Sequence, residues 1–275
     1  MHDNKIVSRA KVLIRWAISI LKNLPLIFEL AITDFKSRYA TSYLGMIWAF
    51  VQPIVSVMIY VIVFGYGFKS TPVQDFPFVL WLVAGIIPWF YFSEALTSAT
   101  NSLREYSYLV KKVIFEIEIL PLVKITAAMI IHIFFILVAV ILYFFYGYMP
   151  SIYYLQLIYY MLCTTVLVMG MSYLTSALTV FVPDLSQIIN IALQFGMWLT
   201  PIMWSSDIFG PNVETVLKIN PLYYIVAGYR DCFYNHVMFW EKPGLTLWFW
   251  AVTMFVLVLG MYAFRKLEKH FADVL

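Results

Sequence analysis

The chain has 275 residues, of which 63% are hydrophobic and only 12% are charged, and its net charge is +3. This composition excludes an ordinary water-soluble domain, in which about half of the residues are apolar and about a quarter are charged. The apolar residues fall in blocks of about 20, the length that an α-helix needs to cross a bilayer core of roughly 30 Å. The sequence therefore predicts an all-α integral membrane protein, with residues 1–275 forming a single transmembrane domain.

The N-terminal segment, residues 1–40, is amphipathic rather than uniformly apolar. Arg15 and Lys22 fall on one face of a helix, and Trp16 falls on another. A helix of this kind lies in the headgroup plane with its apolar face down. Pro25 is expected to interrupt it, because proline removes a backbone donor and clashes with the preceding turn. We therefore predict an interfacial cytoplasmic helix, which serves as an anchor or as a collar that docks a partner.

Six blocks have the length and hydrophobicity of membrane-spanning helices. They lack the alternation of apolar and polar residues that is typical of transmembrane β-strands. Their approximate bounds are 44–64, 79–99, 123–145, 155–180, 185–204 and 245–264.

The basic residues alternate between the segments that connect these blocks, and Lys and Arg are retained on the cytoplasmic side of a membrane. Of the 18 Lys and Arg residues, seven precede the first block, four lie between the second and third, and three follow the last. The opposite connections hold one, none and three. Both termini are therefore predicted to be cytoplasmic, and the basic clusters are expected to contact anionic membrane lipids and no nucleic acid.

Motifs for catalysis or for metal binding are missing from the sequence. Residues 65–71 come nearest to a phosphate loop, but they lack the GxxxxGK[ST] spacing that wraps a phosphate in backbone amides. The four His residues are too scattered to indicate a metal site, and His132 is expected to be a hydrogen-bonded interior residue. Cys163 and Cys232 are not expected to form a disulfide. We predict no catalytic residue, metal or cofactor in this chain.

Two predicted spans carry polar and aromatic side chains at helical spacing. Polar groups inside a bilayer face a protein interior or a watery path, so these stripes suit the wall of a conduit. An equal alternative is that they form only hydrogen bonds between helices of a bundle or a dimer. Glu94, in the second span, is read as a lone carboxylate without a clear partner. The stripes are Trp48, Gln52, Ser56 and Tyr60 in the first span, and Gln187, Asn190, Gln194 and Trp198 in the fifth.

The connection between the fifth and sixth spans, residues 205–244, is predicted to be external and holds apolar runs too short to span a membrane. Two short helices are predicted there, at 213–218 and 223–234, the second opened by Pro221 at a first helical position. Such helices would re-enter the outer leaflet and form a lid. Aromatic residues make up 19% of the chain, and Tyr and Trp suit both membrane interfaces and the flat faces of sugars.

Three runs of residues carry a resemblance to a known family: DFKSRY at 34–39, SYLGMIWAFVQP at 42–53 and NPLYY at 220–224. With these runs and its predicted order of helices, the chain resembles the membrane subunits of type-2 ABC exporters for polysaccharides and polyol phosphates. These are the permeases for O-antigen, capsule and teichoic acid. The resemblance covers essentially the whole chain, but the motifs identify the family better than its cargo.

The resemblance implies a homodimer of this chain with two separate ATPase subunits, which bind the ATP and Mg²⁺ that drive transport. It implies that the first and fifth spans line the path and that the external helices gate its exit. The gate candidates are Tyr223, Tyr224, Tyr229 and Arg230. The loop at 101–120 would contact the ATPase, with a merely solvated loop as the alternative, and its candidates are Arg104, Glu105, Tyr106, Lys111, Lys112 and Glu116.

The leading functional hypothesis is export of an undecaprenyl-linked polysaccharide, with O-antigen first among the candidates, across a bacterial inner membrane. A teichoic acid or capsule exporter of the same architecture is one alternative. Another, from a different class, is a membrane-embedded glycan-modifying enzyme, which requires a cluster of catalytic acids or bases at a membrane face.

Overall fold

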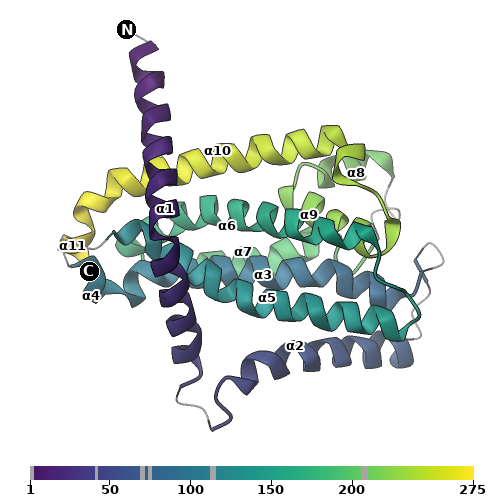
Figure 1. Cartoon of the computed structure of the whole chain (residues 1–275). Helices are drawn as coiled ribbons and strands as arrows, with labels where there is room; N and C mark the ends of the chain where they lie inside the picture. The colour runs from purple at the N-terminus through teal and green to yellow at the C-terminus, as the bar shows by residue number, and fades with distance from the viewer. Residues whose placement is uncertain (1–2, 41–42, 69–71, 74–75, 112–115, 206–209) are drawn as a thin grey trace.

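The computed structural model describes residues 3–40, 43–68, 72–73, 76–111, 116–205 and 210–275, and it is a helical bundle. Its long helices run side by side, one end of the bundle holds α4 and the C-terminus, and the opposite end holds α8 and α9 (Figure 1). The helices are α1 Asp3–Arg38, α2 Ile47–Tyr60 with its π-helical extension η1 Val61–Gly67, α3 Phe78–Glu105, α4 Ser107–Val110, η2 Ile117–Ile119, α5 Leu120–Phe145, η3 Ile152–Leu155, α6 Gln156–Phe181, α7 Leu185–Leu199, α8 Pro211–Leu217, α9 Pro221–Arg230, η5 Asp231–Asn235, η6 Phe239–Glu241, α10 Pro243–Leu267, η7 Glu268–His270 and α11 Phe271–Val274.

The predicted all-α membrane class is confirmed. Within the described residues, five helical stretches are long and apolar enough to cross a membrane, by length and composition: Ile47–Gly67, Phe78–Glu105, Ile117–Phe145, Ile152–Phe181 and Pro243–Val274.

The fifth predicted span, at 185–204, is present as the shorter apolar helix α7, and its predicted end at residue 204 is wrong. The 15 residues of α7 end at Leu199 and, at about 1.5 Å per residue, cover only about 22 Å. Pro201 explains the early end, because a proline pushes the residue before it out of the helical region. Thr200 accordingly has φ −94° and ψ 132°.

α1 lies across the bundle, near the end that holds the C-terminus, and its N-terminal part extends beyond the other helices (Figure 1). This is the placement expected of an interfacial helix. The predicted interruption at Pro25 is wrong, since α1 runs unbroken through it. Pro25 and Leu21 are both exposed, so the carbonyl of Leu21, which loses its helical partner, lies at the surface where water or headgroups can bind it.

α3 forms the centre of the bundle. It packs mainly against α5 and α6, and 83% of its spanning window is buried. α10 packs closely on α6 where Gly170 and Gly260 meet. This close approach requires glycine, because a Cβ on Gly260 would lie only 2.1 Å from the Gly170 carbonyl oxygen. Side chains on α3 are therefore held in a tightly packed frame.

α2 and α7 are, by contrast, poorly covered by the rest of the chain. Only 17% of the spanning window of Ile47–Gly67 is buried, and α7 has no buried residue. α2 packs mainly against α5, whereas α7 packs against α3 and α6. The two helices that carry the predicted path stripes thus lie at the surface of the single chain.

The two short helices predicted before the last span are present as α8 and as α9 with its extension η5, each starting slightly earlier than expected. Asn220 caps α9, because its side-chain oxygen accepts a hydrogen bond from the backbone N–H of Leu222 at 3.0 Å. Pro221 occupies the first turn, where no backbone donor is needed.

Candidate functional site

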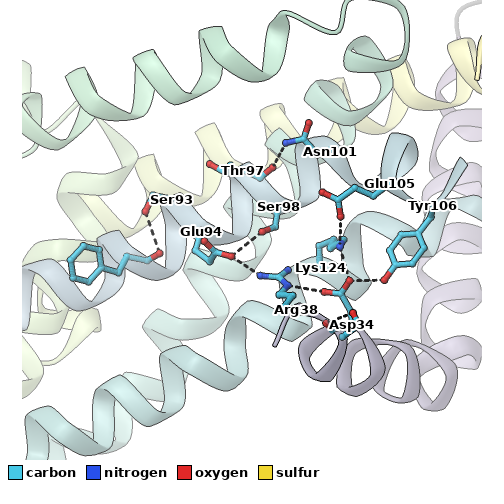
Figure 2. Close-up of polar contacts among 12 residues, drawn as sticks. Asp34, Arg38, Ser93, Glu94, Thr97, Ser98, Asn101, Glu105, Tyr106 and Lys124 are labelled. Atoms are coloured by element: carbon cyan, nitrogen blue, oxygen red, sulfur yellow. Dashed lines mark hydrogen bonds and ion pairs between the residues drawn. The ribbon is translucent and has the colours of Figure 1, made fainter. Parts of the chain in front are cut away.

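A buried carboxylate near the C-terminal end of α1 joins this helix to the bundle (Figure 2). Asp34 of α1 is only 4% exposed. Its Oδ1 accepts hydrogen bonds from Lys124 Nζ of α5 at 2.5 Å and from the Tyr106 hydroxyl at 2.6 Å. Its Oδ2 accepts one from Arg38 Nε at 3.0 Å. One side chain therefore links α1 to α5 and to the residue that follows α3.

The two cations extend these contacts to α3. Arg38 Nη1 donates to Glu94 Oε1 at 2.6 Å, and Lys124 Nζ lies 2.5 Å from Glu105 Oε2. The charges thus alternate along the series Glu94, Arg38, Asp34, Lys124 and Glu105 (Figure 2). We call this series the charge chain, and the end of the bundle that holds it the charged end. Each buried charge in it has at least one opposite partner, as burial requires.

The spacing along each helix explains how the charges meet. Asp34 and Arg38 are four residues apart and share a face of α1. Ile27 and Ala31 continue that face towards the N-terminus, and both are buried. Burying this apolar stripe against α5 carries Asp34 into the bundle, so the carboxylate needs the partners that α5 supplies.

Burial and neighbouring charges shift the pKa values of two side chains of α1 and of one side chain that contacts it. Burial by itself would raise the pKa of Asp34, but the hydrogen bonds from Lys124 and Tyr106 and the charges of Lys124 and Arg38 outweigh it, so the pKa lies below its usual value of 3.8. Burial disfavours the charged form of Arg38, but the charges of Asp34 and Glu94 outweigh it and raise the Arg38 pKa. Burial and the hydrogen bond to Asp34 raise the pKa of Tyr106, which stays a donor at neutral pH.

A cavity of about 260 Å³ lies beside the charge chain, between α2, α3 and α5. Its wall includes Glu94 and two of the predicted path residues, Gln52 and Ser56. His132 also lines it, and its Nε2 lies 2.7 Å from the Tyr229 hydroxyl, which confirms the predicted hydrogen-bonded interior position. Glu94 of the charge chain and two residues of the α2 stripe therefore line one cavity.

The two predicted path stripes are accessible, but a single chain does not join them. The main neighbour of α2 is α5, and those of α7 are α3 and α6. Asn190 Oδ1 accepts a hydrogen bond from Thr97 Oγ1 at 3.3 Å, so the α7 stripe is tied to α3. Five stripe residues are exposed, namely Trp48, Gln52, Gln187, Gln194 and Trp198, and three are half-buried, namely Ser56, Tyr60 and Asn190.

Three of the four predicted gate residues are buried, and Tyr223 is half-buried. The Tyr224 hydroxyl lies 2.9 Å from Thr246 Oγ1 of α10, and Tyr229 pairs with His132 of α5. These contacts fasten α9 to the spans rather than leaving it as a free flap.

Arg230 fastens the same helix to the end of α7. It donates hydrogen bonds to the carbonyl oxygens of Pro201 at 2.8 Å and Ile202 at 2.9 Å. Its guanidinium carbon also lies 3.5 Å from the centroid of the Trp81 ring of α3. The predicted gate residues thus connect α9 with α3, α5, α10 and the end of α7.

The predicted ATPase-contact residues divide into two groups, of which the first faces α1. Glu105 and Tyr106 belong to or touch the charge chain. Glu116 Oε2 accepts hydrogen bonds from Ser19 Oγ at 2.7 Å and Asn23 Nδ2 at 2.6 Å, both on α1. These contacts connect the described part of the segment between α3 and α5 to α1.

The second group lies on the surface of the charged end. Arg104 and Lys111 are exposed, and Lys112 lies outside the described residues. Arg104 lines a hollow of about 520 Å³ together with residues of the α6–α7 turn and Leu275 at the C-terminus. Two exposed basic side chains, of which Arg104 lies beside the hollow, are therefore available to a partner.

Sequence reasoning missed the charge chain. The interpretation of Glu94 as a carboxylate without a partner is wrong, since Arg38 lies 2.6 Å away. Asp34 entered only as part of a motif. Arg38 entered as part of the same motif and as one of the seven basic residues before the first span, and Lys124 only as one of the four between the second and third. The spacing of four residues between Asp34 and Arg38 was a usable signal, because it predicts a shared helix face.

The helical spans, the crosswise α1 and the buried charge chain define a multi-pass helical membrane protein. Within that class the chain belongs to the ABC-2 type transporter family, whose profile matches residues 25–234.

Three relatives with similarity over nearly their whole length are permeases by name. Two proteins of Klebsiella pneumoniae called O-antigen export system permease protein RfbA are each 27% identical to this chain. One alignment spans 264 residues, 94% of this chain and 100% of the relative, and the other 259 residues, 92% and 97%. A Myxococcus xanthus protein of the same name is 24% identical over 250 residues, 90% of this chain and 94% of the relative.

Replacing Asp34 by Asn tests the charge chain through pH. A carboxylate with a lowered pKa stabilises the fold above its ordinary pKa, and that stabilisation is lost as pH falls through the folded value. We expect D34N to have a lower Tm at neutral pH and a smaller loss of Tm between about pH 5 and pH 2. Thermal unfolding of the purified chain in detergent, followed by circular dichroism, measures both.

The matched control is Glu214→Gln, which removes a carboxylate from an ion pair between partly exposed residues, Glu214 and Lys218. Such a pair contributes about 0–1 kcal/mol, so the control should keep the wild-type acid profile. If D34N also parallels the wild type from pH 7 to pH 2, the charge chain does not stabilise α1.

Proposed function

We propose that this chain is the permease subunit of an ATP-driven exporter that moves an undecaprenyl-linked polysaccharide, O-antigen, across the bacterial inner membrane. The family supports a transport function, and the names of three relatives support the cargo class. The observation that carries the proposal is that α2 and α7, which hold the polar and aromatic stripes, are both poorly covered within one chain. Polar groups in a span need protein or water beside them, so these helices border a path or a partner.

A second copy of the chain supplies that cover. In a two-fold dimer, α2 of one copy lies opposite α7 of the other, and the two stripes then face one path. Gln52 and Gln194 hydrogen-bond sugar hydroxyls there, and Trp48 and Trp198 present flat rings to sugar C–H faces. The path needs polar contacts of modest strength, because tight binding would stop the glycan from moving on.

Energy for transport comes from two copies of a cytoplasmic ABC ATPase, which bind ATP and Mg²⁺. The charged end and both chain termini face the cytoplasm. The ATPase docks on the exposed basic surface of Arg104 and Lys111, beside the hollow at the end of α3. Glu105 and Tyr106 carry its movement to Asp34 and so to α1 and to the cavity beside α2.

Replacing Gln52 and Gln194 together by Leu tests the path. Each lost hydrogen bond contributes about 1 kcal/mol, so the double variant loses about 2 kcal/mol and should export roughly thirty-fold less glycan. Surface glycan is measured by gel electrophoresis and immunoblotting in a strain whose own permease gene is deleted, and dimer content by light scattering. The double change to Asn keeps both amides and should restore most export.

Two results would count against this assignment in different ways. If the wild-type chain, expressed together with its ATPase, restores no surface glycan, the proposed export function is wrong. Undiminished export by the Leu variant would mean that both glutamines serve only in helix packing.

Reversing the charges of Arg104 and Lys111 to Glu tests the docking surface. Charge complementarity steers association, so we expect about ten-fold less ATPase to co-purify with the variant. The control Lys218→Glu reverses a charge at the opposite end of the bundle and should leave co-purification unchanged. Equal recovery of the ATPase with both variants would exclude this surface from docking.

A further inference from the structure

A second polar cavity, of about 170 Å³, lies at the end of the bundle opposite the charged end. Trp81 of α3, Glu214 of α8 and Tyr223 of α9 line it, together with residues that follow α7 and α9. We call it the α9 cavity. It contains none of the path-stripe residues and is therefore a separate feature of the fold.

The charged groups of the α9 cavity are largely paired, so its wall offers donors and acceptors rather than a strong field of one sign. Asp231, which is 2% exposed, forms an ion pair with Lys242 and accepts a hydrogen bond from Asn235 Nδ2 at 2.8 Å. Glu214 pairs with Lys218 at 2.8 Å. Such a wall suits a neutral ligand whose hydroxyl groups both donate and accept hydrogen bonds.

Arg230 keeps one side of the cavity rigid. Two backbone carbonyl oxygens and the face of Trp81 hold its guanidinium in place. Gly85 leaves the space that it needs, because a Cβ at that position would lie 2.7 Å from Arg230 Nη2. A wall that is already ordered lowers the cost of binding a ligand.

The rest of the lining suits a sugar ring. Tyr223 and Trp81 place aromatic rings beside the polar groups, and Val226 and Ala227 add an apolar patch. Sugars combine C–H faces, which pack on such surfaces, with hydroxyls, which reach polar tips. The volume is below the roughly 300–1,000 Å³ of pockets for drug-sized ligands, so there is room for one ring and not for an oligosaccharide.

The cavity also lies where a glycan that follows α7 would leave the helix. Trp198 is the last stripe residue of α7, and Pro201 and Ser205 of the cavity wall follow within a few residues. We propose that the α9 cavity binds one sugar ring of the exported glycan at the outer end of α7. This inference rests on the proposed export function, and its binding step is measured apart from export.

Filling the cavity is the direct test. Ala227→Leu adds bulk to the wall without removing a hydrogen bond, and Ala251→Leu makes the same change at an exposed position of α10. The probes are methyl glycosides of glucose, galactose, mannose, rhamnose and N-acetylglucosamine. Saturation-transfer NMR with the chain in lipid nanodiscs detects their binding. A second variant, Asn235→Leu, removes one amide from the wall at an exposed residue.

We expect saturation transfer to at least one glycoside with the wild type and with A251L, and at least five-fold weaker transfer with A227L, at unchanged Tm, and with N235L. No transfer to any probe, or equal transfer with all variants, would overturn the inference. Export measured in the same strains separates the two proposals. If the wild-type chain exports glycan but binds no glycoside, only the sugar site is excluded. If it binds a glycoside but exports no glycan, the export function is excluded.

Discussion

The pairing of the buried Asp34 carboxylate with Lys124 is the contact on which the arrangement of the charged end depends. An ionised group in this position costs several kcal/mol unless it is paired and hydrogen-bonded. Asp34 has three donors, which come from α1 itself, from α5 and from the residue after α3. The two donors from outside α1, Lys124 and Tyr106, therefore hold this helix against the bundle.

This anchoring connects the cavity beside α2 with the surface of Arg104, two regions to which we assign different roles in transport. Glu94 belongs to the charge chain and also lines the cavity that holds Gln52 of the α2 stripe. Glu105, at the other end of the charge chain, adjoins the exposed surface of Arg104. Ion pairs and the packed helix α3 thus form a continuous connection from that surface to the cavity beside α2. At the opposite end, Arg230 fixes α9 to the end of α7 in a comparable way.

Much of the fold could be predicted from the sequence, because hydrophobic length is a local property. The spans, the interfacial α1 and the helices α8 and α9 follow from runs of apolar residues and from prolines at helix starts. Two local errors arose from proline itself. Pro25 sits in an exposed turn that tolerates it, whereas Pro201 ends α7 earlier than the apolar run suggests.

The site was harder to predict, because its contacts are distant in sequence. Lys124 is 90 residues from Asp34, and Glu94 is 56 residues from Arg38. A lone charge at a span end looks the same whether it faces lipid headgroups or a buried partner, and only the packing of α1 on α5 distinguishes them. The polar and aromatic stripes were predicted from their spacing, but the neighbours of α2 and α7 depend on how the whole chain packs.

A double-mutant cycle between Asp34 and Lys124 tests the central claim most directly. The free energy of unfolding is measured in mixed micelles for the wild type, Asp34→Asn, Lys124→Met and the double variant. Contacting residues in one ion-pair network couple by about 0.5–3 kcal/mol, and we predict a value in the upper half of that range. Additivity within about 0.5 kcal/mol would contradict the anchoring of α1 by this pair.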